Sequence, residues 1–146
     1  MTFLQAYEQS GLDRHMTMIL AILLVFLGGA AGSAWRYWWS GLVAQRFGET
    51  FPFGTLVVNL VGSTIIGAFS GLLMHISSGG IAAALQQFVI IGICGGLTTF
   101  SSFSLQTYSL ISEGRWFSAL SNIIFSTGLS FACVAAGWQI TQMVNF

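Results

Sequence analysis

A run of small and hydroxyl-bearing residues from Gly92 to Ser104 carries the clearest chemical signal in this sequence. It reads Gly-Ile-Cys-Gly-Gly-Leu-Thr-Thr-Phe-Ser-Ser-Phe-Ser. Adjacent glycines inside an apolar segment favour a break in a helix, and a helix broken within a bilayer frees backbone carbonyls that can coordinate a small cation. The alternative is a helix that only bends at Gly95 and Gly96, with Thr and Ser hydroxyls bonding back to its carbonyls.

Two phenylalanines follow the glycine pair with the i, i+3 spacing of a helix face. Phe100 and Phe103 therefore project from the same side. Two phenylalanines on a helix are usually core residues. Serines flank both rings, however, and hydroxyl protons together with the electropositive ring edges can bind an anion. The pattern predicts either a packing contact or an anion site.

Polar side chains also recur every four residues in two other apolar segments, so each set shares one helix face. The first set is Thr55, Asn59 and Ser63, and the second is Asn122, Ser126 and Ser130. Interhelical hydrogen bonds account for each Ser or Thr taken singly. Asn59 is the best single pore candidate, because a primary amide at mid-helix depth is costly unless it is paired or faces water.

Composition places these segments in a lipid bilayer. Of the 146 residues, 55% are hydrophobic and only 5% are charged, whereas a soluble domain carries about a quarter charged residues. Four arginines balance four acids and lysine is absent. A chain without a basic surface is not expected to bind nucleic acid. We therefore predict an integral membrane protein.

Charged residues divide the sequence into four spans, each with at least the roughly 20 residues needed to cross a bilayer. We predict the spans at 16–35, 53–74, 82 to beyond 108, and 116–144, with the third interrupted at 94–99 and with loops near 36–52, 75–81 and 112–116. The fold class is all-α, with four transmembrane helices of which the third is broken. Residues 16–146 form one domain, and residues 1–15 form a short polar N-terminal extension.

The arginines give only a weak signal for orientation in the membrane. One end of the bundle would carry Arg14, and the other end Arg36, Arg46 and Arg115. A difference of one against three is compatible with insertion in both orientations, and hence with an antiparallel homodimer. A single orientation set by the three arginines is the alternative.

The apolar parts of the spans contain no acid or base, which bears on the class of transporter. A small proton-coupled multidrug exporter with four helices is the alternative function, but its coupling needs a membrane-embedded acid, and residues 16–35 contain none. A structural membrane subunit without ion flux is a third alternative. An enzyme is not expected, because no nucleophile–base pair or metal-ligand cluster is found at membrane depth in the sequence.

Together these segments resemble the Fluc (CrcB-like) fluoride channels over about residues 28–137. The matching motifs are Gly28-Gly29-Ala30-Ala31-Gly32 with Ala34-Trp35-Arg36, Phe53-Gly54-Thr55 through Val58-Asn59, the run from Gly95 to Ser104, and Glu113-Gly114-Arg115. The run from Gly95 to Ser104 is the most specific of these. The resemblance implies an antiparallel, dual-topology homodimer in the cell (inner) membrane that passes fluoride passively out of the cell.

The resemblance also implies roles for individual residues. Backbone carbonyls of Gly95 and Thr98 from both subunits would hold a sodium ion, Na+. The fluoride path would be lined by Asn59, Phe100, Phe103 and Ser126, with Thr55, Ser130, Ser101, Ser102 and Ser104 as further members. Arg36 matches an arginine at the pore entrance. Gln106 is assigned to the entrance as well and replaces a glutamate that is common in relatives. A neutral amide at this position would have to act through hydrogen bonds alone, without the charge of a carboxylate.

Overall fold

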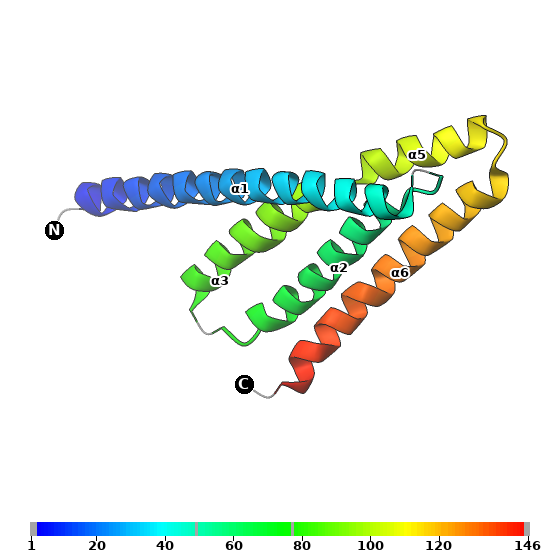
Figure 1. Ribbon diagram of the computed structural model, residues 1–146. Coiled ribbons are helices and arrows are strands. Elements are labelled where there is room, and N and C mark those ends of the chain that lie inside the picture. The colour runs from blue at the N-terminus through cyan, green and yellow to red at the C-terminus, as the bar shows by residue number, and fades with distance from the viewer. Residues whose placement is uncertain (1–2, 49, 77, 145–146) are drawn as a thin grey trace.

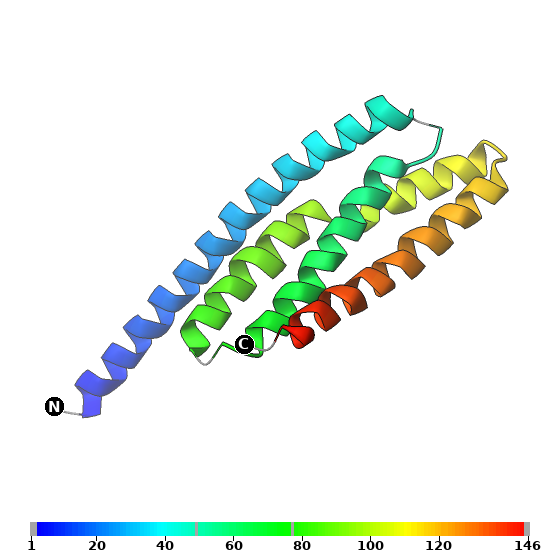
Figure 2. The ribbon, with the colours of Figure 1, turned by 60° about the horizontal axis from the view of Figure 1, so that its bottom comes forward.

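A computed structural model describes the backbone of residues 3–48, 50–76 and 78–144, and the side chains of these ranges from His15 onward. Three helical passes are continuous: α1 (Phe3–Phe47), α2 (Phe53–Leu73) and α6 (Trp116–Met143). Another pass is assembled from α3 (Gly79–Leu85), the π-helical segment η1 (Gln86–Cys94), the short α4 (Gly95–Leu97) and α5 (Phe100–Ser112). The four passes lie side by side (Figures 1 and 2).

Four segments are long and apolar enough to cross a membrane: His15–Phe47, Phe53–Leu73, Gly79–Ser112 and Trp116–Met143. This confirms the prediction of an all-α protein with four membrane-spanning helices. Helix α2 begins directly after Pro52, as expected for a residue that lacks a backbone N–H. Helix α6 follows a turn at Gly114, where φ is 75°.

The predicted loop near 36–52 is wrong in extent. Helix α1 continues past the aromatic cluster to Phe47, so the connection to α2 is confined to residues 48–52. Aromatic residues and arginine are compatible with a helix, and residues 36–47 contain no proline. The helix ends where Gly48 takes φ 76°, a conformation that glycine adopts without strain. At its other end α1 covers most of the predicted polar extension, of which residues 1–2 lie outside the described residues.

Glycines let the helices approach closely. A Cβ atom on Gly28 would meet the Phe88 carbonyl of η1, and one on Gly32 would meet the Ile93 carbonyl. The most extensive helix contact joins α2 to α6, where Gly67 faces the backbone of Val134. These glycines therefore lie on the packing faces of the helices.

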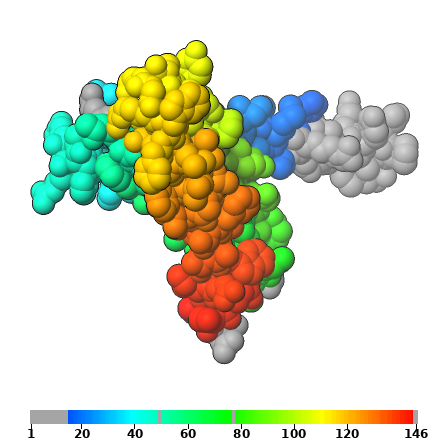
Figure 3. All heavy atoms as spheres, turned by 90° about the vertical axis from the view of Figure 1, so that its right-hand side faces the viewer, coloured from blue at the N-terminus to red at the C-terminus, as the bar shows by residue number. Residues whose placement is uncertain are grey.

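Two loops meet at one end of the bundle, and the α2–α3 connection lies at the opposite end with the end of α6 (Figure 2). Arg115 joins the two loops, because its guanidinium donates to the Thr50 carbonyl and lies 3.3 Å from a carboxylate oxygen of Glu113. Viewed from the side, α5 and α6 (yellow to red) form one face, and the first described side chains of α1 (blue) project beyond the other helices (Figure 3).

Candidate functional site

The third pass is broken at Thr98 and Thr99. These residues are extended, with φ −79° and ψ 155° at Thr98 and φ −152° and ψ 114° at Thr99. Gly95 stays helical, with φ −63° and ψ −36°. The predicted interruption within 94–99 is confirmed, and the alternative of a simple bend at the glycine pair is wrong. Gly96 serves packing instead, since a Cβ atom there would meet the Gly29 carbonyl of α1.

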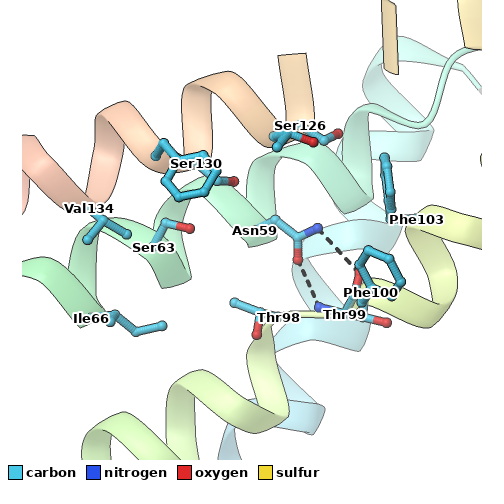
Figure 4. Close-up of a pocket in the computed structure, with 12 residues that line it drawn as sticks. Asn59, Ser63, Ile66, Thr98, Thr99, Phe100, Phe103, Ser126, Ser130 and Val134 are labelled. Carbon is cyan, nitrogen blue, oxygen red and sulfur yellow. Dashed lines mark hydrogen bonds between the residues drawn. The ribbon is translucent and has the colours of Figure 1, made fainter. Parts of the chain in front are cut away.

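Side chains take over the backbone hydrogen bonds at this break. The Thr99 N–H donates to Asn59 Oδ1 at 2.8 Å, and Asn59 Nδ2 donates to the Thr99 carbonyl at 3.4 Å (Figure 4). The Thr99 hydroxyl in turn caps α5 by accepting the Ser102 N–H at 3.1 Å. The half-buried amide of Asn59 is thus paired with the broken backbone, and it also lines a pocket.

The same bonds remove the usual helical donors from two carbonyls. In a continuous helix the Thr99 N–H would bond to the Gly95 carbonyl, and the Ser102 N–H to the Thr98 carbonyl. Both N–H groups donate to side chains here. Gly95 is also exposed, and no heavy atom outside its own helix lies within 4 Å of a Cβ built on it. Backbone carbonyl oxygens are ligands for hard cations, so the residues at this break fit a small cation.

A pocket of about 370 Å³ lies beside the break, between α2, α5 and α6 (Figure 4). It is lined by Asn59, Ser63, Ile66, Thr98, Thr99, Phe100, Phe103, Ser126, Thr127, Ser130, Phe131 and Val134. Five residues predicted for the fluoride path therefore come together: Asn59, Phe100, Phe103, Ser126 and Ser130. None of the lining side chains carries a charge.

The two phenylalanine rings lie together at one side of this pocket. Their centroids are 5.5 Å apart and their planes are tilted by 45°. The Phe100 side chain is 79% exposed in the single chain. Phe100 therefore has little packing within its own chain, and its ring is available to whatever lies in or against the pocket.

Polar hollows on the other side of the break lead toward the end of the bundle that carries Arg115. One, of about 260 Å³, is lined by Ser33, Arg36, Tyr37, Ser40, Thr55, Val58, Thr99, Ser102 and Gln106. It brings together four predicted residues: Arg36, Thr55, Ser102 and Gln106. A neighbouring hollow of about 350 Å³ shares Ser40, Thr55 and Gln106 and reaches Arg115. Thr99 lines both the first hollow and the pocket beyond the break.

Two of the predicted serines lie outside the three cavities. Ser101 and Ser104 are exposed and line none of these three cavities, and the Ser104 hydroxyl donates to the Phe100 carbonyl at 2.9 Å. Gln106 lines two of the cavities, and its buried Oε1 has no hydrogen-bond partner among the residues that the structure describes. The roles predicted for these residues stay predictions.

Thr107 was not singled out by the sequence, and Asn122 had no assigned role. Asn122 Nδ2 donates to Thr107 Oγ1 at 2.8 Å, and Ser126 Oγ donates to Asn122 Oδ1 at 3.1 Å. The Thr107 hydroxyl donates to the Phe103 carbonyl at 2.7 Å. A buried chain of hydrogen bonds therefore ties Ser126 of α6 to α5. The i, i+4 spacing of Phe103 and Thr107 was the available signal.

The chain is similar to known proteins over all four passes. A family model described as "CrcB-like protein, Camphor Resistance (CrcB)" matches residues 23–138. A protein of Opitutus terrae named fluoride-specific ion channel FluC is 51% identical over 116 residues, covering 80% of this chain and 86% of that relative. A relative of the same name from Rhodospirillum rubrum is 49% identical over 126 residues, covering 86% of this chain and 98% of that relative. Another, from Paramagnetospirillum magneticum, is 40% identical over 127 residues, covering 87% of this chain and 99% of that relative. The matched region contains the break and the pocket beside it, and the chain belongs to the CrcB-like family.

Proposed function

We propose that this chain is a fluoride-selective ion channel that gives passive efflux of fluoride and so lowers its concentration in the cytoplasm. The observation that carries the proposal is the uncharged pocket beside the break, whose mostly apolar wall also carries an amide, several hydroxyls and two phenylalanine rings. Relatives that are 40–51% identical along most of their length bear the name fluoride-specific ion channel. The four apolar spans support a position of this pocket within a bilayer.

The pocket has the chemistry that a small, strongly hydrated anion requires. Fluoride gives up its water only where compact donors replace it, and amide N–H groups, hydroxyls and ring edges are such donors. A fixed positive side chain inside the pore would hold the ion, whereas neutral donors bind it weakly enough for release. Neutral hydrogen fluoride that enters a cell from an acidic medium ionises in the cytoplasm, and a passive path for the anion would let it leave.

We also propose that two copies pair in antiparallel orientation. Thr127 is an exposed polar residue on a membrane-spanning helix, and a hydroxyl group facing lipid without a partner is costly. Phe100 and the pocket it lines are open on the surface of the single chain. A second copy would cover these groups, and the weak arginine bias permits the two copies to insert in opposite directions.

A sodium ion between the two copies is part of the same proposal. Each chain offers two carbonyls at the break, Gly95 and Thr98, whose helical donors are diverted to side chains. A two-fold axis through this point would bring four carbonyl oxygens together, and exposed Gly95 leaves room for a close approach. The ion would supply a positive charge that ties the two broken helices together.

Efflux from liposomes tests the function directly. Purified protein is reconstituted with internal fluoride or chloride, and release is followed with ion-selective electrodes under a potassium gradient with valinomycin. We expect rapid release of fluoride and slow release of chloride, without any need for a proton gradient. Efflux of organic cations driven by protons, with no fluoride release, would support the exporter and contradict the channel.

A further inference from the structure

A buried chain of side-chain hydrogen bonds lies behind the pocket and connects α6 to α5. Ser126 lines the pocket, whereas Asn122 and Thr107 lie behind it, 2% and 8% exposed. The chain of donors runs in one direction: Ser126 Oγ donates to Asn122 Oδ1, Asn122 Nδ2 donates to Thr107 Oγ1, and Thr107 Oγ1 donates to the Phe103 carbonyl. All three bonds are between 2.7 and 3.1 Å long.

This direction has a consequence for any anion in the pocket. A serine hydroxyl has one proton, and that of Ser126 is given to Asn122. The pocket therefore meets the lone pairs of Ser126, which repel an anion. Turning the proton toward the pocket by itself would leave Asn122 Oδ1 buried without a donor, and such groups are costly.

We propose that Asn122 is a positioning residue that reverses this chain and thereby releases the Ser126 proton to the ion. The oxygen and the nitrogen of a side-chain amide are nearly equal in size, so the amide can turn end for end within the same packed space. After the turn, Asn122 Nδ2 donates to Ser126 Oγ. The Thr107 hydroxyl moves from the Phe103 carbonyl to Asn122 Oδ1.

The reversed chain keeps every buried group paired. The Phe103 carbonyl retains the backbone N–H of Thr107, four residues later in α5. The three side chains make three hydrogen bonds in the original direction. In the reversed direction they make two, and the third is the bond from Ser126 to the anion. The empty pocket therefore favours the original direction and an occupied pocket the reversed one, so Ser126 becomes a donor only when an ion is present.

This inference rests on the proposed function, and a double-mutant cycle of liposome efflux tests it. Ser126→Ala should lower fluoride efflux by about tenfold, the loss expected for one hydrogen bond to a charged group. Asn122→Leu should cause a similar loss, because without the Asn122 Nδ2 donor the Ser126 hydroxyl turns to the backbone carbonyl four residues earlier in its helix, as the Ser104 and Thr107 hydroxyls do in theirs. If Asn122 acts through Ser126, the double variant should conduct as Ser126→Ala does, within about twofold. Ser121→Ala, on the same helix but in neither the chain nor the pocket, is the matched control and should conduct normally.

A second measurement observes the amide itself in the unmodified protein. The sequence contains only three asparagines, Asn59, Asn122 and Asn145, so ¹⁵N-asparagine labelling gives three side-chain amide groups by NMR. The Asn122 signal, identified by its absence from Asn122→Leu or from Asn122→Gln, should shift when fluoride is added and stay unchanged in Ser126→Ala. Chloride at the same concentration should produce no shift.

Two results would overturn the inference while leaving the channel intact. The first is an unmodified protein that conducts fluoride although its Asn122 signal does not respond to it. The second is a cycle in which the losses from Asn122→Leu and Ser126→Ala multiply, which is the behaviour of a merely structural residue. Absence of fluoride efflux from the unmodified protein would instead overturn the proposed function, and the reversal with it.

Discussion

Replacement of Asn59 tests whether this amide holds the break in the third pass. Asn59→Leu removes both bonds to Thr99, a residue that is only 8% exposed, and leaves its backbone N–H unpaired. The Thr99 carbonyl keeps the first intrahelical bond of α5, because Thr99 is the N-cap of that helix. An unpaired buried group costs about 1–3 kcal/mol, so we expect a loss of this size in the free energy of unfolding.

Asn59→Asp separates the structural role from the conducting one. The carboxylate still accepts the Thr99 N–H and loses only the longer bond to the Thr99 carbonyl, which is worth about 1 kcal/mol. The same change places a negative charge in a pocket that otherwise has none. We therefore expect a folded protein with at least tenfold lower fluoride efflux at neutral pH. Efflux should recover at acidic pH, because protonation removes the charge.

Thermal unfolding in detergent and liposome efflux on the same preparations decide between the outcomes. Thr64→Val on α2 is a matched control, since its hydroxyl bonds only to the Leu60 carbonyl of its own helix. An Asn59→Leu protein that is as stable as the unmodified one would refute the reasoning about the break. An Asn59→Asp protein that conducts at the normal rate at neutral pH would refute the requirement for an uncharged pocket.

Three further predictions use the same assays. Phe100→Leu should fold normally, because the ring is 79% exposed in its own chain, and should pair normally, because leucine keeps the apolar surface that a second copy would cover. It should nevertheless lose most fluoride efflux with its ring edge, and normal efflux would make Phe100 a packing residue. Gly95→Val should weaken both pairing and efflux, because the added side chain keeps the two chains apart. Thr98→Ser should have little effect on either, because the proposed sodium ligand is a backbone oxygen. A Gly95→Val protein with normal pairing and efflux would argue against the sodium site. Ser78→Cys should be labelled by an impermeant thiol reagent in about half of the molecules on intact cells. Labelling of nearly all or almost none would contradict dual topology.

The four spans were predictable from the sequence because charges, Pro52 and the turn at Gly114 separate long apolar segments. The end of α1 was not, since Arg36 and the aromatic residues beside it mark a membrane boundary rather than the end of a helix. Nothing before Gly48 stops that helix. The prediction took the polarity of residues as a sign of a loop, whereas only a change in backbone conformation ends a helix.

The residues of the site were more predictable from the sequence than the hydrogen bonds that join them. Periodicity identified Asn59, Ser126 and Ser130 as residues of inner faces, and the structure brings them to one pocket. The position of the break depends on a contact between helices, because Asn59 pairs with Thr99 some 40 residues away. Thr107 was not predicted, because its hydrogen-bond partner Asn122 lies on another helix and no spacing in the sequence relates the two residues.

The extended pair at Thr98 and Thr99 also limits how this sequence can change. A substitution that made the third pass a better helix would return the Thr99 N–H to the Gly95 carbonyl and so free Asn59 from its backbone partner. Such a chain would gain regular structure and, on the proposed function, lose both the cation ligands and the form of the pore. Selection for local stability and selection for conduction therefore act in opposite directions at these two threonines, and an amide on a different helix decides the outcome.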